Sequence, residues 1–166
     1  MAGFLAKPVG FSAVFVHHIF VHIASLLILI FSAAITIQLG GKTKAVLFVL
    51  LCLLISPGFG RTQQLFQPVV FSELCWVLGF YQLIRFIKNP QHRHLLYLTL
   101  TLAFGFLTKY DIVFLIAGLV GLFFFEKTRS YLLRIATVPY MLLFLAIISP
   151  NVWWQYEHNF PMFQMF

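Results

Sequence analysis

The chain is a succession of long apolar runs separated by short polar and cationic clusters. Of its 166 residues, 61% are hydrophobic and 9% are charged, whereas soluble globular domains carry about 25% charged residues. A helix of about 20 apolar residues is long enough to cross a bilayer. The sequence therefore excludes a soluble domain and predicts an all-α fold, a polytopic transmembrane helical bundle.

Six apolar runs are the predicted membrane spans. The second run is short, so we expect its helix to begin within the preceding loop. The fourth and fifth runs are also short, and two arrangements fit them: helices whose ends reach into the polar zone of the bilayer, or a re-entrant hairpin buried in protein. We expect a turn at 56–60, a charged loop at 126–130 and a stop at Pro150 and Asn151. The six runs are residues 13–39, 45–55, 69–87, 95–107, 112–125 and 131–149.

The Lys and Arg residues indicate how such a bundle lies in its membrane. Cytoplasmic loops are enriched in these residues. With six alternating spans, the richer side is cytoplasmic, both ends of the chain face outward, and the net charge of +7 reflects topology rather than nucleic-acid binding. The expected location is the plasma membrane of a bacterium. The richer side holds Lys42, Lys44, Arg85, Lys88, Arg93, Lys127, Arg129 and Arg134, and the other side holds Lys7, Arg61 and Lys109.

The segment between the fourth and fifth runs carries a cation, a phenol and an acid in three consecutive residues: Lys109, Tyr110 and Asp111. Charged groups at membrane depth are costly, and they are usually functional or paired. The predicted topology places Arg61, Glu157 and His158 on the same outer side, and Glu73 near the outer end of its span. This mixed cluster fits an anionic lipid head group beside a carboxylate that activates an acceptor. Snorkelling or structural pairing is the alternative for each residue.

Other polar residues in the apolar runs have simpler explanations. His18 and His22 have the i, i+4 spacing of a metal pair, but no third ligand is evident nearby. We therefore interpret them as structural histidines and predict no metal site. Cys52 and Cys75 lie within apolar runs and are interpreted as small buried hydrophobic residues.

An ordered series of short motifs resembles the polytopic glycosyltransferases of family 39, the dolichyl-phosphate-mannose-protein mannosyltransferase-like group. The resemblance runs from about Phe15 onward. The motifs are LGG at 39–41, LFQPV at 65–69, WVL at 76–78 with Tyr81, GFLTKY at 105–110, PN at 150–151, WQ at 154–155 and HNFP at 158–161.

The resemblance implies a GT-C membrane enzyme. Such enzymes transfer a sugar from a polyprenyl-phosphate donor to a lipid, glycan or protein outside the cytoplasm, in contact with membrane lipids. Lys109 or Arg61 would bind the donor phosphate through a charge-assisted hydrogen bond. Tyr110 would contact a sugar or serve as an interface anchor. The resemblance is compatible with a divalent cation, although the residues themselves predict no cofactor.

The chain also departs from the family. Relatives carry a catalytic acid in the first outer loop, whereas no acid precedes Ala13 here, so the catalytic residue stays unknown. Many relatives have an Asp where this chain has Ser72. Glu73 would replace it, but it points about 100° away on a helix. Because family members are several times longer, we expect residues 1–166 to be the transmembrane region of a partial GT-C-like enzyme: an internal fragment, a truncated gene product or a degenerate copy. The rival is a small non-enzymatic membrane protein, such as an assembly subunit or a transporter-like module.

Overall fold

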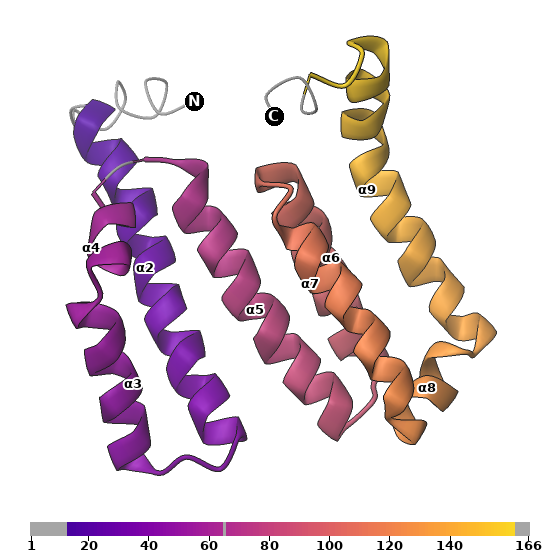
Figure 1. The fold of residues 1–166 in the computed structure, drawn as a ribbon, viewed down its shortest axis with the longest axis horizontal. Coiled ribbons are helices and arrows are strands. Elements are labelled where there is room, and N and C mark those ends of the chain that lie inside the picture. The colour runs from indigo at the N-terminus through magenta and orange to yellow at the C-terminus, as the bar shows by residue number, and fades with distance from the viewer. Residues whose placement is uncertain (1–12, 65, 162–166) are drawn as a thin grey trace.

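The computed structural model describes residues 13–64 and 66–161, with the backbone alone at 13–17, 127 and 135 (Figure 1). Within these residues the chain is helical and has no strand. The all-α prediction is therefore confirmed, and Lys7 lies outside the described residues. The four longest helices are α2 (Ala13–Gln38), α5 (Pro68–Lys88), α6 (His92–Thr108) and α9 (Val138–Glu157).

The helices alternate in direction along one common bundle axis (Figure 1). One end gathers the start of α5, the turn from α6 into α7 and the end of α9. The opposite end gathers the connections from α2 to α3 and from α5 to α6, together with α8. At this second end, Lys88 Nζ donates to the carbonyl oxygen of Gln38 and ties α5 to α2.

The second apolar run forms α3 (Thr43–Ile55), which begins inside the preceding loop as predicted. The predicted turn after it is instead the short helix α4 (Pro57–Thr62). Ser56 caps this helix, since its Oγ accepts a hydrogen bond from the backbone N–H of Phe59 at 3.5 Å. Pro57 stands at the first helical position, where its missing N–H costs nothing. The Ser-Pro pair that suggests a turn therefore starts a helix.

The fourth and fifth runs form a hairpin that lies along α5. The second arm consists of α7 (Ile112–Gly118) and the 3₁₀ helix η1 (Leu119–Phe124). Near the Lys109 turn, Ile112 packs against Leu102. At the far end, Leu122 packs against Phe86 and Leu95. Both arms therefore run from one end of the bundle to the other.

The charged loop predicted at 126–130 is wrong, because these residues belong to the helix α8 (Glu126–Leu132). Thr128 holds this helix against the bundle. It is fully buried, and its Oγ1 lies 2.7 Å from the Leu122 carbonyl oxygen and 2.9 Å from that of Phe125. Both carbonyls also accept a backbone N–H, from Phe125 and Arg129. The buried hydroxyl adds a further bond to each and stabilises the close turn between η1 and α8.

The last predicted span has both limits wrong. Helix α9 starts at Val138, after the 3₁₀ turn η2 (Ile135–Thr137), and continues through Pro150 to Glu157. Proline in a helix removes the hydrogen bond to the carbonyl four residues earlier. Here Ser149 Oγ donates to that carbonyl, Ala146 O, at 3.0 Å. The serine replaces the lost bond, and the helix persists.

Glycine allows the helices to approach closely near the Lys109 end. A Cβ added at Gly105 of α6 would lie 2.9 Å from Ile112 Cγ1 and 3.2 Å from Cys75 Cβ. Small residues at such crossings are typical of membrane helix packing. Gly105 lies one turn before Lys109, whose N–H bonds the Gly105 carbonyl at 2.8 Å. The close approach therefore fixes where the turn that carries Lys109 begins.

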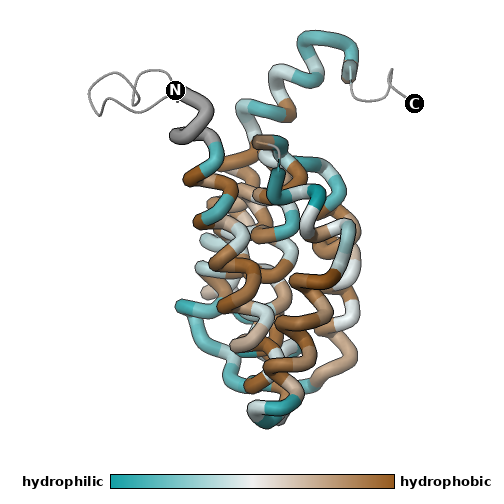
Figure 2. Tube along the Cα trace, turned by 90° about the vertical axis from the view of Figure 1, so that its left-hand side faces the viewer, coloured by the Kyte–Doolittle hydropathy of each residue, from teal (hydrophilic) through white to brown (hydrophobic). Residues whose placement is uncertain are grey.

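The surface of the bundle is suited to a bilayer. Apolar residues cover its middle and polar residues its ends (Figure 2). By length and composition, two of the described helical segments are candidate spans, His18–Gln38 and Pro68–Lys88. Thr43–Ile55 and Ile112–Phe124 are apolar but shorter. A helical membrane protein is therefore supported, and the number of six spans stays a prediction.

Candidate functional site

The turn between α6 and α7 presents a close ion pair. Lys109 follows the last residue of α6 in an extended conformation, with φ −161° and ψ 136°. Its Nζ lies 3.3 Å from Asp111 Oδ2, and the two side chains are 49% and 30% exposed. Because the pair is partly open to solvent, its own contribution to stability is small. It leaves ammonium protons free to bind another anion.

Asp111 is also bound from the side of α5. The Ser72 hydroxyl lies 2.9 Å from Asp111 Oδ1 and 3.1 Å from Oδ2, and Ser72 is only 2% exposed. A buried hydroxyl that donates to a carboxylate forms a charge-assisted bond. Ser72 therefore fixes the carboxylate, which in turn orients Lys109.

Glu73, the next residue of α5, faces a different neighbour. Its Oε2 lies 3.1 Å from Thr62 Oγ1 at the end of α4, and the same hydroxyl lies 3.0 Å from the Phe59 carbonyl oxygen. Adjacent helical residues are rotated by about 100°, which explains why Ser72 and Glu73 contact different elements. The carboxylate beside Ser72 is that of Asp111, which comes from the turn between α6 and α7. Glu73 is still close enough to interact electrostatically with Lys109.

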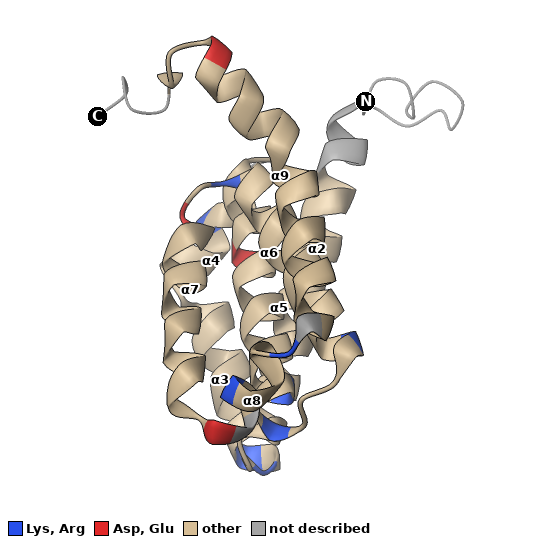
Figure 3. Ribbon diagram, turned by 90° about the vertical axis from the view of Figure 1, so that its right-hand side faces the viewer, with Lys and Arg blue, Asp and Glu red and all other residues tan. Residues whose placement is uncertain are grey.

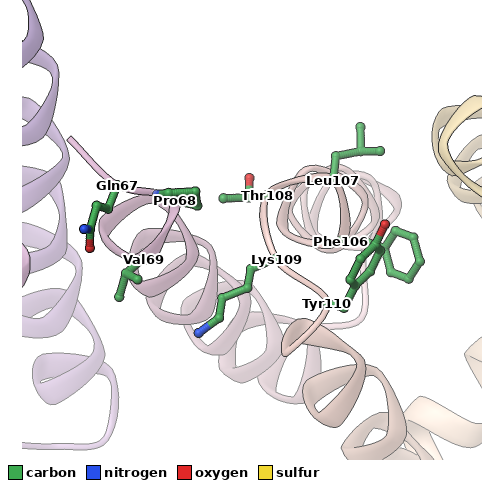
Figure 4. A pocket seen from close by; sticks show the side chains of 8 residues that line it. All are labelled: Gln67, Pro68, Val69, Phe106, Leu107, Thr108, Lys109 and Tyr110. Atoms are coloured by element: carbon green, nitrogen blue, oxygen red, sulfur yellow. The ribbon is translucent and has the colours of Figure 1, made fainter. Parts of the chain in front are cut away.

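Tyr110 joins the turn to α9. Its hydroxyl donates to Asn151 Oδ1 at 2.8 Å and accepts from Gln155 Nε2 at 2.7 Å. Its ring meets Phe106 edge-on, with centroids 5.1 Å apart. Lys109 extends toward α5, whereas Tyr110 lies on the other side of the turn against Phe106 (Figure 4). The consecutive side chains therefore face different parts of the bundle.

A pocket of about 480 Å³ lies at this end of the bundle (Figure 4). Its volume falls within the range of roughly 300–1,000 Å³ that is typical of small-molecule sites. Lys109 is the charged residue in its wall. The start of α5 and the end of α6 supply the lining residues Gln67, Pro68, Val69, Phe106, Leu107, Thr108, Lys109 and Tyr110.

Two other predicted site residues lie apart from this pocket. Arg61 is exposed in the last turn of α4 and does not line the pocket. His158 follows α9, where its ring stacks on Trp154 with centroids 4.4 Å apart and its Nδ1 lies 2.8 Å from the Trp154 carbonyl oxygen. The structure thus groups Lys109 with Asp111, places Glu73 and Tyr110 beside them, and leaves Arg61 and His158 outside.

Four residues that complete these contacts are not among the predicted site residues: Ser72, Thr62, Asn151 and Gln155. Asn151 and Gln155 do appear in the family-like motifs, and their i, i+4 spacing places both on one face of a helix. That spacing is the signal that would find them. Ser72 is marked by the resemblance alone, as the position where many relatives have an Asp. Thr62 has no comparable signal, because hydroxyl residues are common in apolar helices.

No metal cluster is evident in the described part of the chain, where no three His, Cys, Asp or Glu side chains gather. The His18 and His22 rings have centroids 6.1 Å apart. The carboxylates of Asp111 and Glu73 are engaged by Ser72 and Thr62 instead.

An apolar bundle with polar ends, two helices suited to spanning a bilayer and a charged pocket at one end defines a helical membrane protein. The chain belongs to the dolichyl-phosphate-mannose-protein mannosyltransferase family, whose family model matches residues 4–154. This is a membrane-integral family of the GT-C type. The resemblance carried by the ordered motifs is therefore confirmed. Neither the curated proteins nor the solved structures gave a significant match.

Proposed function

We propose that this chain is the donor-binding part of a membrane glycosyltransferase that uses a polyprenyl-phosphate-linked sugar. The acceptor is a lipid, glycan or protein on the non-cytoplasmic side. One observation carries the proposal: Lys109, a half-exposed cation, lines a pocket at the end of an apolar bundle. A donor with its tail in the bilayer and its phosphate at the boundary needs a cation at this depth.

The proposed topology has six spans, with the Lys109 pocket facing outward. Charged residues gather at the two ends of the bundle, and the end opposite the pocket holds most of the cations (Figure 3). The positive-inside rule assigns that end to the cytoplasm. We place the protein in a bacterial plasma membrane. The described cations at this end are Lys42, Lys44, Arg85, Lys88, Arg93, Arg129 and Arg134.

Within the site, Lys109 would bind the donor phosphate with the protons that Asp111 leaves free. Asp111 and Glu73 are the carboxylates near that phosphate. Each carboxylate already accepts a hydrogen bond from a protein hydroxyl, that of Ser72 or that of Thr62, and neither lines the pocket. We therefore assign them to substrate binding and leave the catalytic base unassigned.

Tyr110 would act as a positioning residue. Its hydroxyl donates its one proton to Asn151 and accepts from Gln155, so one lone pair remains for a ligand. This use of the phenol favours attachment of α9 to the turn over direct recognition of a sugar.

The test is a titration of the protein in nanodiscs with a polyprenyl phosphate, read by native mass spectrometry. Lys109→Ala removes the proposed phosphate partner and should weaken binding at least tenfold, since a lost charge-assisted bond costs about 1.5–3 kcal/mol. Arg129→Ala, an exposed cation in α8 at the opposite end, is the matched control and should leave binding unchanged. Equal losses in the two variants would refute the assignment of Lys109.

A further inference from the structure

A second cavity, of about 440 Å³, lies between α6, η1 and α9 toward the cation-rich end. Leu98 and Leu102 of α6 and Leu122 of η1 form its buried floor, at 2%, 6% and 5% exposure. Tyr140 and Phe144 of α9 form the opposite wall. From Leu95 to Leu102 the cavity follows α6 for about 10 Å, at 1.5 Å per residue.

The interior of this cavity is suited to hydrocarbon. Only Thr99, Thr137 and Tyr140 among its lining residues carry a polar side-chain atom. The Thr137 hydroxyl is already used, since it donates to the Tyr131 carbonyl oxygen at 3.1 Å. A polar ligand would lose its hydration here without gaining partners.

The end of the cavity nearest α8 meets a cationic and aromatic surface. Tyr140 stacks on His92 with centroids 5.9 Å apart, and His92 lies 5.2 Å from the Tyr131 ring. The Arg134 guanidinium lies over that same ring, 5.7 Å from its centroid. Arg93 follows His92 and is exposed. Glu126 is the one acid of the described chain at this end, so the surface is net positive.

We propose that this cavity binds an anionic phospholipid, with one acyl chain along α6 and the phosphate beside Arg134 and His92. The site rests on the membrane placement proposed above, and it lies at the opposite end from Lys109. Basic pockets between helices on the cytoplasmic side recognise anionic head groups. The charge around the mouth therefore selects the head group, and the apolar interior accommodates the chain.

The cationic mouth favours an anionic lipid over a further apolar helix as the occupant of the cavity. A single acyl chain is much thinner than a helix, and it enters from the bilayer through the exposed apolar rim, where Val120 is 64% and Met141 63% exposed.

The test measures which lipids stay bound when the whole protein is released from nanodiscs of phosphatidylglycerol and phosphatidylcholine in equal parts. Native mass spectrometry should show several-fold enrichment of phosphatidylglycerol. Arg134→Gln should reduce the enrichment about fivefold, the effect of one cation near a head group. Arg129→Gln, in the neighbouring helix, should leave it unchanged. Equal retention of the two lipids, or equal effects of the two variants, would overturn the proposal.

A second pair of variants tests the cavity itself. Val120→Trp fills the rim and should lower the retention of both lipids, whereas Val113→Trp, on α7 outside the cavity, should not. Lys109→Ala separates this proposal from the donor site, because it should weaken polyprenyl-phosphate binding at least tenfold and leave phosphatidylglycerol retention intact. If phosphatidylglycerol retention fell with Lys109→Ala and not with Arg134→Gln, the lipid site would be misplaced.

Discussion

Ser72 donates its buried hydroxyl to Asp111 across 39 residues of sequence, and this bond connects α5 to the turn that presents Lys109. Asp111 then holds Lys109 Nζ at 3.3 Å. Lys109 is thus positioned through two successive contacts, Ser72 with Asp111 and Asp111 with Lys109. The Ser72 hydroxyl is buried, whereas the ion pair is partly exposed. A substitution of Ser72 should therefore alter the orientation of the Lys109 side chain.

Ser72→Ala removes the donor and leaves the Asp111 carboxylate with a single partner. We expect a loss of about 1–2 kcal/mol in unfolding free energy, since hydrogen bonds to charged groups contribute about 1.5–3 kcal/mol and Asp111 is partly solvated. Polyprenyl-phosphate affinity should fall several-fold, because Lys109 loses its fixed orientation. Titration in nanodiscs measures the affinity, and reversible unfolding in mixed micelles measures the stability. Ser130→Ala, in the exposed part of α8, is the control. An unchanged donor affinity would show that Ser72 does not position Lys109.

Tyr110→Phe tests whether the phenol positions α9 or contacts a sugar. The substitution removes the bonds to Asn151 and Gln155 and should destabilise the fold by about 1–2 kcal/mol. Binding of a bare polyprenyl phosphate should stay within about threefold of wild type, since this contact is made by Lys109. The same variant should bind the sugar-linked donor equally well. A selective loss of the sugar-linked donor would instead assign Tyr110 to the sugar.

Gly105→Ala tests the close approach of α5, α6 and α7. The new methyl group would meet Ile112 at 2.9 Å and Cys75 at 3.2 Å, and overpacking of this kind costs about 1–3 kcal/mol. Gly118→Ala is the matched control because no atom lies within 4 Å of its added Cβ. That change should be neutral or stabilising by up to about 1 kcal/mol, as alanine favours helix. The same destabilisation in both variants would contradict a packing role for Gly105.

Ser149→Ala tests how α9 tolerates its proline. Without the serine, the Ala146 carbonyl loses the partner that replaces the missing N–H, which should cost about 0.5–1.5 kcal/mol. In a Pro150→Ala background the backbone N–H returns, and the serine substitution should then be nearly neutral. A double-mutant cycle in the unfolding free energy measures this coupling. Additive effects would mean that the hydroxyl does not compensate for Pro150.

The helices were largely predictable from the sequence, because long apolar runs need little tertiary information. Pro68–Lys88 lies within one residue of its predicted run at both ends. The failures occur where a side chain alters a local rule. Pro150 predicts the end of a helix, but the bond from Ser149 to the Ala146 carbonyl oxygen lets α9 continue. The charged residues at 126–130 predict a loop, but they form a helix whose Thr128 is buried against the bundle.

The candidate site was predictable only in part. Lys109 and Asp111 stand two residues apart in a polar interruption, so their pairing follows from local sequence. The contact of Asp111 with Ser72 depends on how α7 packs against α5, and no local pattern encodes that register. Arg61 and His158 share the end of the bundle with Lys109, as the topology predicts. Although they lie at the same end of the bundle, Arg61 and His158 do not line the pocket that contains Lys109.

The most direct test of donor binding at Lys109 is to map where a polyprenyl phosphate binds. A photoreactive analogue with the label next to the phosphate would be crosslinked to the protein in nanodiscs and located by peptide mass spectrometry. Donor binding at Lys109 should place labels in the pocket wall, at residues 67–69 and 106–110, that disappear in Lys109→Ala and persist in Arg129→Ala. Labels concentrated at the cation-rich end, around Arg93 and Arg134, and insensitive to Lys109 would contradict it.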